Sequence, residues 1–211
     1  MLNNLELSLL ALVRSALDGT AEVFPEGFSL EDVYAISISQ QITPMIYIGA
    51  LNCGFPQNDA IMEKLFVSSC HFLSVGESQR LEMTALEDAF QKCGIDYLPL
   101  KGDVLKNLYP ERHMRTMADI DILIREEQYQ KIKEIMLENG YSQGAESDNE
   151  RHWFKGQVHI ELHIRLFPFY DKELYDYFGS GWERAKLCAG NQYRYEMSTE
   201  DLFVFLFVHF T

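Results

Sequence analysis

Two aspartates stand two positions apart in the apolar run Met117-Ala-Asp-Ile-Asp-Ile-Leu-Ile124. Because side chains of a β-strand alternate between its faces, Asp119 and Asp121 are expected to point the same way. Two carboxylates held side by side repel each other unless a cation or a proton lies between them. Such a pair suits Mg²⁺, which binds one or two carboxylates together with substrate phosphates. The alternative is that both aspartates lie on a solvated strand face or cap a turn.

A Lys-Gly-Asp sequence, Lys101-Gly-Asp103, precedes the aspartates by about one short helix. Unpaired backbone N–H groups at a helix start, together with the helix dipole, attract phosphate. Gly102 would let the backbone approach a ligand closely. Phosphate at a helix start, with a metal site on the next strand, indicates a nucleotide-binding site.

The segment Gln157–Leu166 shows the clearest alternation of apolar and polar residues in the chain. Glu161 lies on its polar face with His159 and His163, and on a neighbouring strand it could complete a carboxylate triad with Asp119 and Asp121. The alternative is an ordinary polar outer face. Two histidines and one glutamate at this spacing are a weak zinc signal. We therefore expect the histidines to surround the site or to lie at the surface.

Composition narrows the possible partners. The chain has 211 residues and a net charge of −14, so a nucleic acid, whose phosphates require basic patches, is an improbable main substrate. A small nucleotide carried with Mg²⁺ remains compatible. The four cysteines form no CxxC pair and indicate free thiols of a reducing compartment. The sequence shows no secretory signal and no membrane span, which predicts a cytoplasmic protein without membrane partners.

Periodicity predicts an α+β chain in three parts. Residues 1–93 form a helical N-terminal region without a chemical cluster, which we expect to pack and to shape the substrate site. Residues 94–197 form the α/β core, and residues 198–211 begin a C-terminal helical region. Because the chain stops inside an apolar helix, we expect it to be a fragment of a longer protein.

Within the core, the pattern predicts strands separated by helices and turns. The predicted strands are 95–100, 118–124, 151–155, 157–166 and 192–197, and the predicted helices are 103–109, 126–139 and 171–178. Residues 142–150 are polar and predict a turn or mobile loop. Gly156-Gln157 predicts a hairpin turn.

Several of these motifs together resemble one family. The chain resembles the uncharacterised bacterial nucleotidyltransferase family of the DNA polymerase β-like superfamily. The motifs that carry the resemblance are Leu100-Lys-Gly102, Tyr109-Pro110, Arg115, Asp119–Ile124 and Ile160-Glu-Leu-His163. The resemblance covers roughly residues 80–211. It implies a polymerase β-like core with a mixed sheet, a glycine at a helix start, an Asp-x-Asp strand and a third carboxylate on a later strand.

The resemblance also implies roles for individual residues. Asp119, Asp121 and Glu161 become catalytic residues and metal ligands, and Lys101, Gly102, Asp103 and Arg115 become nucleotide-binding residues. The sequence departs from many relatives in two ways. Asp103 follows the glycine where serine or glycine is common, and the third carboxylate is a glutamate.

The activity implied is a Mg²⁺-dependent transfer of a nucleoside monophosphate from a nucleoside triphosphate such as ATP. Two Mg²⁺ ions would clamp the in-line displacement, and pyrophosphate would leave. The acceptor, a small molecule or a protein bearing a hydroxyl group, is not identified by the sequence. The main alternative is a catalytically inactive nucleotide-binding or regulatory module. A helical interaction protein without a nucleotide site would place Asp119, Asp121 and Glu161 far apart.

Overall fold

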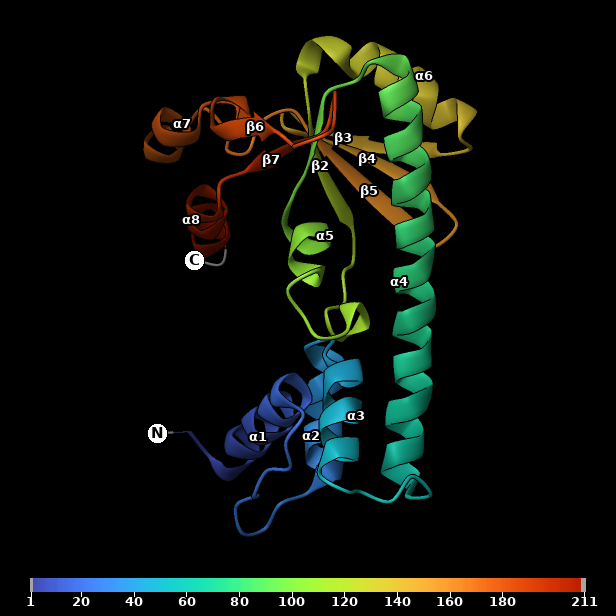
Figure 1. The fold of residues 1–211 in the computed structure, drawn as a ribbon, viewed down its shortest axis with the longest axis vertical. Coiled ribbons are helices and arrows are strands. Elements are labelled where there is room, and N and C mark those ends of the chain that lie inside the picture. The colour runs from blue at the N-terminus through green and yellow to red at the C-terminus, as the bar shows by residue number, and fades with distance from the viewer. Residues whose placement is uncertain (1, 210–211) are drawn as a thin grey trace. The chain divides into compact units, whose positions relative to one another are not determined.

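The computed structural model describes residues 2–209, which form two compact units. The first unit contains the chain up to Glu77 together with Leu105–Thr116, and the second contains Ser78–Val104 and the chain from Met117 onward. Two helices, α4 (Ala60–Cys93) and α5 (Lys101–Lys106), each contribute residues to both units. Figure 1 labels the α-helices of both units and the strands from β2 onward.

The first unit is helical. It contains α1 (Asn4–Asp18), α2 (Leu30–Ser39), α3 (Thr43–Asn52), the first part of α4 and the short helix η1 (Arg112–Met114). Asn3 begins α1 with a capping box, because its side chain accepts from the Glu6 amide while Glu6 accepts from the Asn3 amide. Leu12, Val33, Ile46 and Leu65 form part of the buried core of this unit.

The second unit is organised around a mixed five-stranded sheet (Figure 1). Its strands, in spatial order, are β1 (Tyr97–Pro99), β2 (Ile120–Ile124), β5 (Val158–His163), β4 (Glu150–Lys155) and β3 (Ser142–Glu146). The β2 and β5 strands are parallel, and every other neighbouring pair is antiparallel. The parallel pair therefore joins the second strand of the sheet to the central strand, β5.

One face of this sheet is apolar and carries the main core. Ile122 of β2, Ile160 of β5 and Trp153 of β4 are fully buried there. Two helices cover this face, the second part of α4 and α6 (Tyr129–Glu138), which follows the short helix η2 (Glu126–Gln128). Because apolar residues occupy one parity of each central strand, the alternate residues of β2, β4 and β5 must point to the opposite face.

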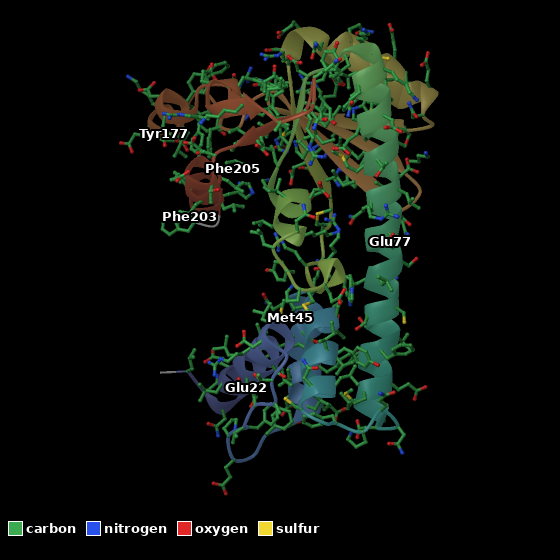
Figure 2. All side chains as sticks on the ribbon, in the orientation of Figure 1. Glu22, Met45, Glu77, Tyr177, Phe203 and Phe205 are labelled. Carbon is green, nitrogen blue, oxygen red and sulfur yellow. The ribbon has the colours of Figure 1, made fainter. Side chains whose placement is uncertain are left out.

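The opposite face carries Phe154 of β4 and is apolar around Leu98 and Leu123. There it packs against the C-terminal elements, which are α7 (Lys172–Phe178), η3 (Trp182–Arg184), β6 (Ala185–Leu187), β7 (Tyr195–Met197) and α8 (Thr199–His209). Phe205 of α8 is buried in this cluster, whereas Phe203 of the same helix is exposed (Figure 2). The remainder of this face is polar.

The structure confirms an α+β chain with N-terminal helices and a mixed sheet. It corrects residues 142–150, predicted as a turn or loop, because Ser142–Glu146 form the edge strand β3. The strand predicted at 118–124 begins only at Ile120. The short strand β6 was not predicted. Among the described residues, no helix is both long and apolar enough to cross a membrane.

Candidate active site

The polar part of the sheet centres on the pairing of β2 with β5. Asp121 and Glu161 are register partners across these parallel strands, so both side chains leave the same face at the same level. Together with His163 they form a cluster in which one ligand atom of each residue lies within 4.8 Å of the others. The structure thus brings together two of the three carboxylates that the sequence predicts as metal ligands.

Asp121 is buried and has two basic neighbours. Its Oδ1 accepts a hydrogen bond from His163 Nε2 at 2.8 Å and another from Lys101 Nζ at 3.2 Å. Burial alone would raise the pKa of the Asp121 carboxyl, but the hydrogen bonds and charges of His163 and Lys101 outweigh burial and lower it. Asp121 is therefore held as a carboxylate, the form that a metal ion requires.

Asp119 lies in a bend immediately before β2 and is partly buried. Its carboxylate is near enough to act on Glu161. Burial raises the pKa of the Glu161 carboxyl, and the negative charges of Asp119 and Asp121 raise it further. These three acidic residues thus interact electrostatically, although Asp119 is not part of the compact cluster of ligand atoms.

Lys101 reaches Asp121 from an unusual backbone position. Its φ is +37°, in the left-handed region that residues other than glycine rarely adopt. Such a conformation costs about 1–3 kcal/mol and occurs often at functional sites. The backbone is fixed at this point because the Leu100 amide donates to the Asp121 carbonyl at 3.0 Å. Lys101 therefore starts α5 with its ammonium group directed at the acidic pair.

The other predicted nucleotide-binding residues have different surroundings. Gly102 is buried against Met117, where an added Cβ would lie 2.4 Å from Sδ. Burial raises the pKa of Glu87 on α4, and the charge of Asp103 is among the contributions that raise it further. Arg115 belongs to the first unit, and its buried Nε has no hydrogen-bond partner among the residues described. Nucleotide binding by these three residues stays a prediction.

Sequence reasoning gave too little weight to residues of β4 and to the histidines. His163 is buried and contacts Asp121 directly, and its Nδ1 lies 3.7 Å from Glu150 Oε1. His152 of β4 is the register partner of Glu161. The alternation of polar residues in β5, together with the hairpin turn that joins β4 to it, carried this information.

His209, in the last turn of α8, interacts electrostatically with residues of the site. Burial lowers the pKa of the His209 imidazole, and the positive charge of Lys101 lowers it further, while Asp121 opposes both effects. A single sequence gives no signal for this proximity, because it depends on how α8 packs against the polar face.

A pocket of about 650 Å³ lies beside this cluster. Glu150, which approaches His163, lines the pocket together with Arg151, Arg165, Phe169 and Tyr170. The Arg165 guanidinium stacks on the Phe169 ring with 4.0 Å between the guanidinium carbon and the ring centroid. The pocket thus combines aromatic rings with both acidic and basic side chains, since Glu126 and Asp148 also line it, which suits a flat polar group.

Comparison with known protein families gives one match. The model of a family described as an uncharacterised nucleotidyltransferase matches residues 26–211, so the chain belongs to this family. The match includes every element of the second unit and most of the first. Comparisons with curated proteins and with solved structures found no match. Membership therefore supports nucleotidyl transfer as the general activity and leaves the acceptor unidentified.

Proposed function

We propose that this protein transfers a nucleoside monophosphate from a Mg²⁺-bound nucleoside triphosphate to a hydroxyl-bearing acceptor and releases pyrophosphate. The observation that carries the proposal is the register pairing of Asp121 with Glu161, with Lys101 and His163 at the same point of the sheet. Family membership gives the reaction class.

The acidic residues fit a hard divalent ion. Asp121 and Glu161 offer carboxylate oxygens within 4.8 Å of each other, and the charge of Asp119 acts on the same region. We propose that Asp119, Asp121 and Glu161 hold the Mg²⁺ ions, with two ions in the complete site. Bound Mg²⁺ would polarise the phosphoryl oxygens and lower the pKa of the acceptor hydroxyl.

The residues of the chain then have separate tasks. The acceptor oxygen forms a bond to the α-phosphorus, the bond from that phosphorus to the bridging oxygen breaks, and pyrophosphate leaves. Glu161 would bind the second Mg²⁺ ion or accept the hydroxyl proton. Lys101 would place a positive charge by the leaving pyrophosphate. The pocket lined by Arg165 and Phe169 would admit the acceptor.

A second candidate function is a nucleotide-binding or regulatory module without turnover. One observation favours it, because Lys101 and His163 already bind the Asp121 carboxylate directly. A metal ion must replace or reorganise these contacts. Turnover, rather than binding, separates the two functions.

The test is pyrophosphate release by the purified chain with Mg²⁺, each nucleoside triphosphate and a pool of metabolites and proteins as acceptors. Asp119→Asn and Asp121→Asn should each lower the rate at least about 100-fold, since a metal ligand supplies several kcal/mol of transition-state stabilisation. Asp176→Asn on α7, an exposed position, is the matched control and should keep the rate. Binding of Mg²⁺ and nucleotide without pyrophosphate release from any acceptor would support the module instead.

A further inference from the structure

Two histidines that the proposed reaction does not use lie beside Glu161. His152 Nδ1 is 3.0 Å from His159 Nε2 and 3.3 Å from Glu161 Oε1. His159 Nε2 is 3.7 Å from the same Glu161 oxygen. Three potential ligand atoms, two imidazole nitrogens and one carboxylate oxygen, therefore surround a single point on the polar face of the sheet.

The spacing of these atoms matches one tetrahedral ion. With metal–nitrogen and metal–oxygen bonds of about 2.0–2.1 Å, two ligands at tetrahedral corners lie about 3.3 Å apart. The three distances in the cluster fall on both sides of this value. Imidazole is a good ligand for zinc and its neighbours in the transition series, whereas Mg²⁺ prefers oxygen. The donor set therefore differs in kind from that of Asp119 and Asp121.

The fold holds these side chains in position. His152 is the register partner of Glu161, and Phe154 is the register partner of His159. The Phe154 ring stacks on the His159 ring with 4.5 Å between centroids and 9° between planes. Glu150 Oε2 lies 3.9 Å from Nε2 of His152, the nitrogen that faces away from the cluster. A carboxylate behind a histidine commonly orients that histidine toward a metal ion.

The two oxygens of Glu161 face different neighbours. Oε1 faces His152 and His159, whereas Oε2 lies 3.8 Å from Nε2 of His163, which bonds to Asp121. One carboxylate can therefore contribute to two adjacent cation sites. The side chains of His152, His159 and Glu161 are 23%, 24% and 16% exposed, so solvent can supply a fourth ligand.

We propose that His152, His159 and Glu161 form a second cation site, which binds one divalent transition-metal ion of the zinc class and leaves one position open to water or substrate. The site shares Glu161 with the proposed reaction but uses neither Asp119 nor Asp121. An open position on three protein ligands is typical of catalytic rather than structural zinc sites.

Titration calorimetry with Zn²⁺ tests this site on the full chain, stripped of metal and measured with excess Mg²⁺ and no nucleotide. The wild-type chain should bind one Zn²⁺ ion at this site. His152→Ala and His159→Ala should each weaken binding at least about tenfold, because each removes one of three ligands. His71→Ala, which removes an exposed imidazole from α4, is the matched control and should bind Zn²⁺ like the wild type.

Asp121→Asn separates this proposal from the proposed function. It should keep Zn²⁺ affinity while losing pyrophosphate release, so either inference can fail without the other. Loss of Zn²⁺ binding in Asp121→Asn, with binding kept in both histidine variants, would place the ion at the Asp121 cluster and overturn the proposal. Absence of Zn²⁺ binding in the wild type would also overturn it. Melting curves without metal check folding, and His152→Asn and His159→Gln replace any variant that fails to fold.

Discussion

At the scale of single residues, Asp121 and Glu161 are neighbours whose pKa values shift in opposite directions. The Asp121 side chain is 6% exposed and is hydrogen-bonded to Lys101 and His163, which lower its pKa. Burial and neighbouring negative charges raise the pKa of Glu161. One carboxylate therefore stabilises the metal-free fold when ionised, whereas ionisation of the other opposes it.

This contrast predicts different effects of two similar substitutions. In metal-free protein at neutral pH, Asp121→Asn should lower the free energy of unfolding by about 1–3 kcal/mol, because it leaves Lys101 and His163 without their anion. Glu161→Gln should be neutral or stabilising, since it removes a disfavoured charge. Urea unfolding curves measure both. Equal destabilisation by the two substitutions would contradict the electrostatic assignment.

The raised pKa of Glu161 also predicts a dependence on pH. Between the ordinary glutamate value of 4.5 and the raised folded value, the native state keeps a proton that the unfolded state has lost. The Glu161 contribution to stability therefore falls as pH rises through this window, and it is constant above the window. Urea unfolding in EDTA across this pH range should show a larger fall in the free energy of unfolding for the wild type than for Glu161→Gln. If the free energy of unfolding of the wild type, minus that of the variant, instead grows with pH, the pKa of Glu161 is lowered rather than raised.

At the scale of elements, the hairpin of β4 and β5 could be predicted from the sequence. A two-residue turn at Gly156-Gln157 fixes which residues face each other, so it places His152 opposite Glu161. The parallel pairing of β2 with β5 could not be predicted in the same way. A helix and a hairpin separate these strands in the sequence, and local periodicity does not set their register. That pairing places Asp121 beside Glu161.

The edge strand β3 shows another limit of the sequence pattern. Residues 142–146 read Ser-Gln-Gly-Ala-Glu and are mostly exposed, so they carry no apolar alternation. Their strand conformation comes from pairing with β4. Position relative to a neighbour, rather than local propensity, decides the structure of such a segment.

The packing of α1 against α3 gives a prediction at this scale. An added Cβ at Gly49 would lie 2.1 Å from the backbone oxygen of Leu12, which cannot rotate away as a side chain could. Gly49→Ala should therefore destabilise the chain by about 1–3 kcal/mol or more, as expected for an overpacked contact.

Gly76→Ala on α4 is the matched control. Its added Cβ would meet only Lys106 Nζ, at 3.8 Å, so alanine should be neutral or stabilise by up to about 1 kcal/mol through its higher helix propensity. Thermal melting of both variants measures the difference. Equal melting temperatures would contradict the close contact between α1 and α3.

At the scale of the whole molecule, each of the two units has a buried apolar core of its own. The candidate acidic residues, Lys101 and the histidines around them all belong to the second unit. Arg115 is the one predicted site residue that belongs to the first. The domain boundary predicted after residue 93 stays a prediction.

The charge of the whole chain gives a last prediction. With 32 acidic and 18 basic residues, the net charge is −14, so a long polyanion is repelled, whereas a triphosphate neutralised by Mg²⁺ is not. Fluorescence anisotropy of a labelled DNA duplex, at low salt of about 50 mM, should show no binding, because low salt favours electrostatic contacts with phosphates. A labelled nucleoside triphosphate should bind under the same conditions only when Mg²⁺ is added. Duplex binding that weakens steeply with added salt would contradict this prediction. It would mean that a local basic surface binds nucleic acid despite the negative net charge. The acceptor would then be sought among nucleic acids.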